Sequence, residues 1–183
     1  IASRIAEIKG LKDEAARFAA GAEKTKNGIF RRLRSRDQLK YDNGRQTAQA
    51  IALSMRFMNE QDVDVVGEAF VQSIVDGGTR LDVGIAGAKH LFRALSSAGY
   101  DDLALEILLK RTGKSYADWI AAGSTTLWED FDDGFSRNHV MYGDFAAWAY
   151  QYLAGIRVSG FRSPERGPVK IGSWTFAAET TEN

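Results

Sequence analysis

Apolar residues recur every three or four positions along most of the chain, which is the pattern of helices that bury one face. The stripes predict helices at these positions: Ile5, Ile8, Leu11, Ala15 and Ala19; Ile51, Met55 and Met58; Val66, Phe70 and Ile74; Leu91, Leu95 and Ala98; Leu103, Ile107 and Leu108; and Phe145, Trp148, Ala149, Tyr152 and Leu153. A further short helix is expected near residues 27–33, which brings the total to about seven helices.

Glycines rather than prolines separate these stripes. Both prolines of the chain, Pro164 and Pro168, follow the last stripe. The glycines that stand outside or between stripes are expected to end helices or to form tight turns, and they are Gly77, Gly78, Gly87, Gly99 and Gly155. Long helices joined by such turns predict an all-α fold of paired helical hairpins, and this length would suit half of a helical toroid.

The composition changes after Gly155. Residues 169–171 and 174–176 are rich in β-forming side chains and flank Gly172 and Ser173, a two-residue hairpin signal with glycine first. We therefore expect a helical domain over residues 1–156, then a linker and the start of a small β segment over residues 157–183. The last residues, 177–183, have the composition of a polar tail.

Charge and cysteine content exclude several classes of function. The chain has 24 basic and 24 acidic residues, so its formal charge is zero, which argues against a dedicated nucleic-acid or anionic-membrane binder. There is no cysteine, and a zinc site would need the two distant histidines, His90 and His139, so no metal or cofactor is expected. The chain begins at Ile1 without a leader, and we expect it to be a piece of a longer polypeptide; the compartment stays open.

Three local motifs fail as functional signatures. Residues 113–115 (Gly-Lys-Ser) imitate the end of a phosphate-binding loop, but Leu108 occupies the position of the first glycine. Residues 130–134 resemble the start of a calcium loop, yet the twelfth position is Met141 instead of glutamate. The basic run is expected to be a solvated helix end, and consists of Arg31, Arg32, Arg34 and Arg36.

One non-helical loop carries the side chains that proteins use to hold a sugar. Residues 123–131 include Trp128 and Glu129, and Asn138 and His139 follow after a short acidic turn. An aromatic face packs on the C–H surface of a sugar ring, while carboxylate, amide and imidazole groups bond to hydroxyls. Spacing alone leaves a second interpretation open, in which Trp128 is a core anchor and Glu129 a surface acid.

At these residues the sequence resembles the inverting α-L-rhamnosidases of bacteria and fungi, a family of glycoside hydrolases. The resemblance rests on five segments in matching order: residues 46–48 (Gln-Thr-Ala), 84–87 (Gly-Ile-Ala-Gly), 123–129 (Gly-Ser-Thr-Thr-Leu-Trp-Glu), 136–139 (Ser-Arg-Asn-His) and a helix with Trp148 that finishes in 153–156 (Leu-Ala-Gly-Ile). An ordered set over this length is far more specific than any single motif.

The resemblance implies the later half of an (α/α)6 catalytic toroid, followed by the first strands of a C-terminal β-sandwich. It implies that Glu129 is the general base that activates water for inversion and that His139 binds sugar hydroxyls. Trp128 and Asn138 would share that site. The chain departs from the family at one position, where Tyr116 replaces a tryptophan and Trp119 is nearby, and these two residues are further candidates for sugar contacts. The general acid would lie outside this chain, in the remainder of the same polypeptide, and the expected partner is a rhamnosyl glycoside.

Two other functions remain possible at this stage. A related toroid hydrolase or lyase for another deoxy sugar or a uronic acid would keep Glu129 and change the sugar contacts. A non-catalytic carbohydrate-binding or interaction module would keep the pocket without turnover. The residues that precede Ile1 would discriminate between these possibilities, because an acidic motif there would supply the missing acid.

Overall fold

The fold is known from a computed structural model, which describes residues 1–35, 40–131, 136–156, 170–171 and 174–175. Its first half contains α1 (Ala2–Ile8), α2 (Lys12–Leu33), the short turn η1 (Asp42–Gly44), α3 (Gln46–Ser54), η2 (Glu60–Asp62) and α4 (Val63–Asp76). Its second half contains α5 (Ile85–Ser97), α6 (Asp101–Leu109), α7 (Tyr116–Ala121), η3 (Val140–Gly143), α8 (Asp144–Trp148), η4 (Ala149–Leu153), β1 (Lys170–Ile171) and β2 (Trp174–Thr175). The predicted helical class is confirmed.

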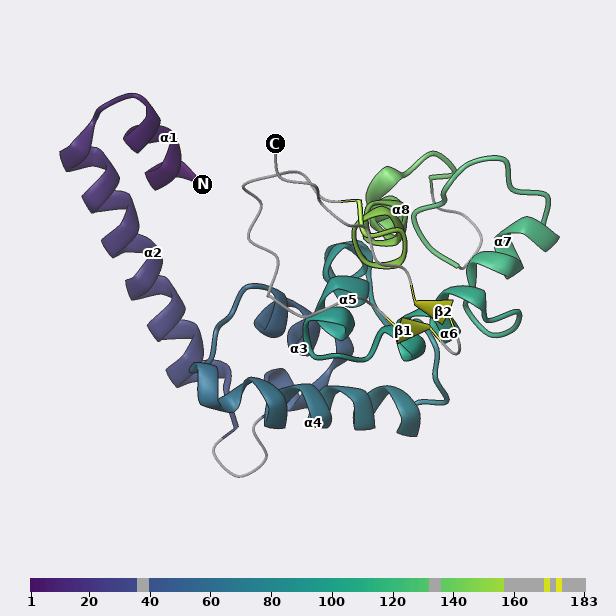
Figure 1. Cartoon of the computed structure of the whole chain (residues 1–183). Helices are drawn as coiled ribbons and strands as arrows, with labels where there is room; N and C mark the ends of the chain where they lie inside the picture. The colour runs from purple at the N-terminus through teal and green to yellow at the C-terminus, as the bar shows by residue number, and fades with distance from the viewer. Residues whose placement is uncertain (36–39, 132–135, 157–169, 172–173, 176–183) are drawn as a thin grey trace.

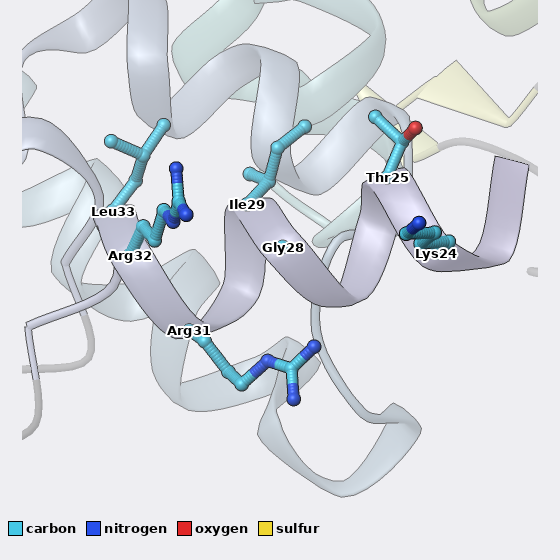
Figure 2. A pocket seen from close by; sticks show the side chains of 7 residues that line it. All are labelled: Lys24, Thr25, Gly28, Ile29, Arg31, Arg32 and Leu33. Atoms are coloured by element: carbon cyan, nitrogen blue, oxygen red, sulfur yellow. The ribbon is translucent and has the colours of Figure 1, made fainter. Parts of the chain in front are cut away.

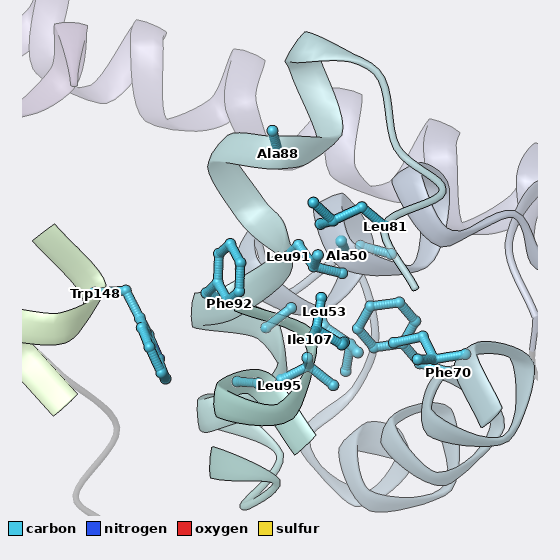
Figure 3. Close-up of a cluster of buried hydrophobic side chains, with 14 of the residues drawn as sticks. Ala50, Leu53, Phe70, Leu81, Ala88, Leu91, Phe92, Leu95, Ile107 and Trp148 are labelled. Carbon is cyan, nitrogen blue, oxygen red and sulfur yellow. The ribbon is translucent and has the colours of Figure 1, made fainter. Parts of the chain in front are cut away.

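The core lies around α5, which packs most extensively on α3 and also contacts α4, α6 and α8 (Figure 1). Figure 3 shows Leu53, Phe70, Leu91, Phe92 and Trp148 from four different helices converging on this centre. All five side chains are at most 1% exposed. Burying a large apolar side chain stabilises the fold by about 1.5–3 kcal/mol, so this cluster holds the helical layers together.

The first two helices form an arm that projects from the rest of the molecule (Figure 1). The single stripe expected from Ile5 to Ala19 is wrong in one respect, because Gly10 adopts a left-handed φ of 74° and separates α1 from α2. The separate helix expected near residues 27–33 is also wrong, since α2 continues without interruption to Leu33. Gly21 and Gly28 lie inside α2, where glycine weakens a helix by about 1 kcal/mol without ending it.

Apolar side chains stay exposed along this arm. Ile5 is 53% exposed, Ile8 76% and Leu33 51%. Figure 2 shows a shallow depression near the end of α2, lined by Ile29 and Leu33 together with the basic side chains of Arg31 and Arg32. The arm thus leaves single apolar side chains exposed at both of its ends.

Arg34 corrects the expectation of a solvated basic run. Its guanidinium forms a 2.9 Å ion pair with Asp62, and both side chains are less than 20% exposed. The guanidinium also lies 4.6 Å from the ring centre of Phe30. Arg31 and Arg32 are exposed as predicted, whereas Arg36 lies outside the described residues. Arg34 therefore ties the end of α2 to the segment before α4.

Gly87 was expected between helices and lies instead in the first turn of α5, where it is buried. A Cβ at this position would lie 2.5 Å from Thr47 Oγ1 and 2.9 Å from Val83 Cβ. Only glycine lets α5 approach α3 this closely. The residue is needed for helix packing rather than for a chain break.

The predicted hairpin near the C-terminus is confirmed in its paired residues. β1 and β2 are antiparallel, with Lys170 opposite Thr175 and Ile171 opposite Trp174. Gly172 and Ser173 of the predicted turn lie outside the described residues, as do residues 157–169 and the tail.

Candidate active site

Two extended segments after α7 form the candidate site. Glu129 N donates a 2.8 Å hydrogen bond to Ser136 O, and His139 N donates a 2.7 Å bond to Leu127 O. Thr126 Oγ1 donates to the carbonyl oxygen of Arg137. This pairing brings the Trp-Glu segment beside the Asn-His segment.

Helix α7 precedes the first of these segments. It begins directly after residues 113–115, the Gly-Lys-Ser sequence that is similar to the end of a phosphate-binding loop. Gly113 and Lys114 both have left-handed φ values, 71° and 60°, and form a tight turn. Ser115 then caps α7, because its side chain accepts from Asp118 N while the Asp118 carboxylate accepts from Ser115 N. This reciprocal capping box explains the residues without any role in phosphate binding.

Glu129 is half-buried, and its Oε2 accepts a 3.2 Å hydrogen bond from Ser136 N. Within the described part of the chain its carboxylate forms no ion pair. A carboxylate held by one backbone N–H keeps acceptor capacity for a water molecule.

Trp128 lies beside Glu129 in sequence and is also half-buried. The Arg137 guanidinium stands 4.7 Å from its ring centre, in cation–π geometry, and the Trp119 ring is 6.1 Å away. Trp128 therefore has one contact with the core and one with the Asn-His segment, which fixes the two segments against each other.

Trp119 and Tyr116 lie beneath the loop. Both are buried, at 3% and 8% exposure. Trp119 Nε1 donates a 3.1 Å bond to Asp130 O, and its ring stacks on Phe131 at 4.4 Å. Tyr116 OH donates to Tyr142 O at 2.9 Å. These contacts make the two residues supports of the loop, and their expected contact with a sugar stays a prediction.

His139 and Asn138 lie on the second segment. His139 is half-buried and directly precedes η3, whereas Asn138 is exposed and its backbone N–H donates to Ser136 Oγ at 3.4 Å. The segment places both next to Leu127 and Glu129, but no contact joins the His139 ring to Glu129 or Trp128 among the described side chains.

A cavity of about 960 Å³ opens next to this loop. Asp130 and Phe131, which directly follow Glu129, form part of its wall, and Tyr142 lies beside them. The described residues that line this cavity do not include Trp128, Glu129, Asn138 or His139. Burial raises the pKa of Tyr142 to about 12, and the nearby Asp130 raises it too, so this wall keeps a neutral phenol.

The first 153 residues match the protein family described as the bacterial alpha-L-rhamnosidase 6 hairpin glycosidase domain. The chain belongs to this family. The sequence pattern of residues 46–156 had pointed to it, and the helical hairpins described above agree with its name.

Named proteins and solved structures that resemble this chain are also alpha-L-rhamnosidases. An alpha-L-rhamnosidase of Alteromonas sp. (strain LOR) is 28% identical over 92% of this chain and 20% of its own length. The structure of an alpha-L-rhamnosidase from Dictyoglumus thermophilum has a TM-score of 0.78 at 29% identity and covers 86% of this chain and 18% of that one. The Streptomyces avermitilis enzyme, solved in complex with L-rhamnose, has a TM-score of 0.76 at 27% identity, over 84% and 16%. The chain thus spans about a fifth of the length of its curated relatives.

The structure explains two of the rhamnosidase landmarks as supports. Gln46 is 5% exposed; its Nε2 donates to Arg80 O at 3.1 Å and its Oε1 accepts from Asp82 N at 3.1 Å. It thereby holds the loop that leads into α5. Thr47 follows it and meets Gly87, the last residue of the other landmark, at the close approach of α3 and α5.

The sequence pattern did not indicate four charged residues that line the cavity. These residues are Asp42, Arg45, Asp82 and Lys114. The Asp-Asn-Gly sequence of 42–44 was an available signal, because these residue types tolerate left-handed turns.

Neither a metal site nor a membrane span emerges from the described residues. His, Asp and Glu side chains there do not gather in groups of three or more that would hold a metal ion. No helix in the same part of the chain is long and apolar enough to cross a membrane.

Proposed function

We propose that this chain is part of an α-L-rhamnosidase that removes terminal α-L-rhamnose from glycosides with inversion at the anomeric carbon, with Glu129 as the general base. The observation that carries the proposal is the Glu129 carboxylate, anchored by Ser136 N and directly followed by the cavity residues Asp130 and Phe131. The family membership and the alpha-L-rhamnosidase relatives support the substrate class.

In this mechanism Glu129 takes a proton from a water molecule, whose oxygen attacks the anomeric carbon from the face opposite the leaving group. A second carboxyl group, about 6.5–9.5 Å away, donates its proton to the glycosidic oxygen as the C–O bond breaks. We assign that acid to a part of the polypeptide outside this chain, and the isolated 183-residue chain is then expected to hydrolyse nothing at a meaningful rate.

Trp128, Asn138 and His139 are proposed to surround the sugar, since they flank the base on the two paired segments. Tyr116 and Trp119 complete the proposed sugar site from below through their hold on Tyr142 and Asp130. We also propose that residues 1–156 form the catalytic part and that residues 157–183 lead into a C-terminal β-sandwich, which the pairing of β1 with β2 supports.

The test uses the longer protein that carries this chain and an aryl α-L-rhamnoside. Glu129→Gln should lower kcat by about 10²–10⁴-fold with little change in sugar affinity, because the amide binds water but takes no proton. Glu106→Gln, at an exposed position of α6, is the matched control and should leave kcat unchanged. NMR of the first product should show β-L-rhamnose. Equal activity of Glu129→Gln and wild type, or an α product, would overturn the proposal.

A further inference from the structure

The cavity whose wall includes Asp130 and Phe131 extends well beyond the loop that carries Glu129. From Asp130 and Phe131 it reaches across to η1 and to the end of α2, where Ile29 and Leu33 line it. Its volume of about 960 Å³ is at the upper end of the 300–1,000 Å³ typical of pockets that hold drug-sized ligands with several rings. One end of the cavity is therefore lined by the two residues that follow the proposed base in the chain, and the other end is left for a different part of the substrate.

The inner wall of this cavity is apolar and aromatic. Tyr41 and Tyr142 present their rings, because both hydroxyl groups are already used: Tyr41 OH donates to Phe57 O at 2.7 Å, and Tyr142 OH to Val83 O at 2.8 Å. Ile51, Phe57 and Val83 continue the apolar surface, and all three are half-buried. This wall suits the face of a ring rather than its hydroxyl groups.

The far rim carries charge. Asp42 begins the η1 turn and Arg45 directly follows it, and both line the cavity. Asp42 and Asn43 have left-handed φ values of 44° and 56°. Gln49, fully buried in α3, fixes this turn by accepting a 2.6 Å hydrogen bond from Tyr41 N. A carboxylate and a guanidinium, three residues apart in the chain, thus line this end of the cavity, and both residues are exposed.

We propose that the η1 end of this cavity binds the leaving group of the glycoside, a hydroxylated ring with an apolar face, and that Asp42 and Arg45 determine specificity by bonding to its hydroxyls. The proposal rests on the proposed function, because the ring to be cleaved must occupy the Asp130 end, whose lining residues directly follow Glu129 in the chain. The leaving group would then lie across that ring from the base, as inversion requires. A carboxylate accepts from hydroxyls and a guanidinium donates to them, so the pair recognises either kind of hydroxyl contact.

The test measures the dissociation constants of three hydrolysis-resistant 1-thio-α-L-rhamnosides for the longer protein that carries this chain. Their leaving groups are methyl, 6-hydroxy-2-naphthyl and 4-linked glucosyl. The last two both present a hydroxylated ring, and comparing them shows whether the cavity prefers an aromatic ring or a sugar ring. At least one of them should bind about tenfold or more tightly than the methyl compound. Asp42→Asn and Arg45→Gln should each reduce that advantage about threefold or more, with methyl binding unchanged.

Controls separate the cavity from general effects. Asparagine tolerates the left-handed φ of position 42, so Asp42→Asn should keep the melting temperature. Ile51→Gln, on the inner wall, should weaken the naphthyl compound, whereas Ile120→Gln, at a 72% exposed position of α7 away from the cavity, should not. Equal affinity for all three compounds in an enzyme that hydrolyses aryl rhamnosides, or an advantage that survives both rim substitutions, would overturn this proposal alone. Failure to bind the methyl compound and to hydrolyse any rhamnoside would instead overturn the proposed function.

Discussion

Glu129 and Ser136 are joined by a reciprocal pair of hydrogen bonds: Glu129 N donates to Ser136 O at 2.8 Å, and Ser136 N donates to Glu129 Oε2 at 3.2 Å. The first bond sets the backbone of the loop, and the second sets the carboxylate. A proposed general base is therefore positioned by a segment seven residues further along the chain, and the integrity of that pairing should control activity.

Thr126→Val should lower kcat of the longer protein about three- to tenfold, because it removes the hydroxyl that donates to Arg137 O and loosens the two paired segments. One such bond contributes about 0.5–1.5 kcal/mol. Steady-state kinetics on an aryl rhamnoside measures the effect. Thr125→Val, at the exposed neighbouring position, is the control. Equal kcat values for the two variants would contradict a positioning role of Thr126.

Gly87→Ala should destabilise the fold by about 1–3 kcal/mol, because its Cβ would meet Thr47 and Val83 at the contact of α5 with α3. Gly21→Ala should instead raise the free energy of unfolding by about 0.5–1 kcal/mol, since that position lies inside α2 with nothing within 4 Å of the new Cβ. Chemical denaturation of the 183-residue chain gives both values. A similar change in both variants would show that helix propensity alone governs position 87.

Trp148→Phe should cost about 2–3 kcal/mol. The indole is fully buried and its Nε1 donates a 2.7 Å bond to Ser96 Oγ, so the substitution leaves both a gap and a buried hydroxyl without its partner. Ser96→Ala should cost about 1–3 kcal/mol for the same unmade bond. In a double-mutant cycle the two losses should be less than additive, and strict additivity would mean that the bond contributes nothing.

Acid should weaken the fold through His90, whose Nδ1 lies 2.6 Å from Ser54 Oγ between α5 and α3. Burial lowers the pKa of His90, Lys89 lowers it further, and Asp144 and Arg93 act in opposite directions. Below the ordinary value of about 6.5 the unfolded chain then binds more protons than the folded one. The free energy of unfolding should be highest above that pH and should fall as the pH decreases toward the lowered pKa.

Denaturation of the 183-residue chain between pH 5 and pH 7.5, about the window in which histidine titrates, checks this sign. His90→Gln should flatten the dependence in this range, because glutamine does not titrate. An unchanged slope in the variant would assign the effect to other groups.

The sequence by itself determined the helical class, several of the core positions and the composition of the candidate site. Val66, Phe70 and Ile74 recur at helical spacing and are all fully buried in α4. Periodicity carries this information because the helix repeat is local, and each residue needs only its neighbours three and four positions away. The Trp-Glu and Asn-His segments were likewise readable, since their residue types stand together in the chain.

Only the tertiary structure decided how distant segments meet. In the sequence Gly87 looks like a break between helices, but in the structure it makes room for α3 against α5. Arg34 likewise looks like a solvated charge in the sequence, but in the structure it forms a 2.9 Å ion pair with Asp62. The cavity joins Asp42 to Asp130, which are far apart along the chain and share no local pattern. Contacts of this kind depend on how helices pack, and no spacing within one segment encodes them, so the walls of the proposed site became visible only in three dimensions.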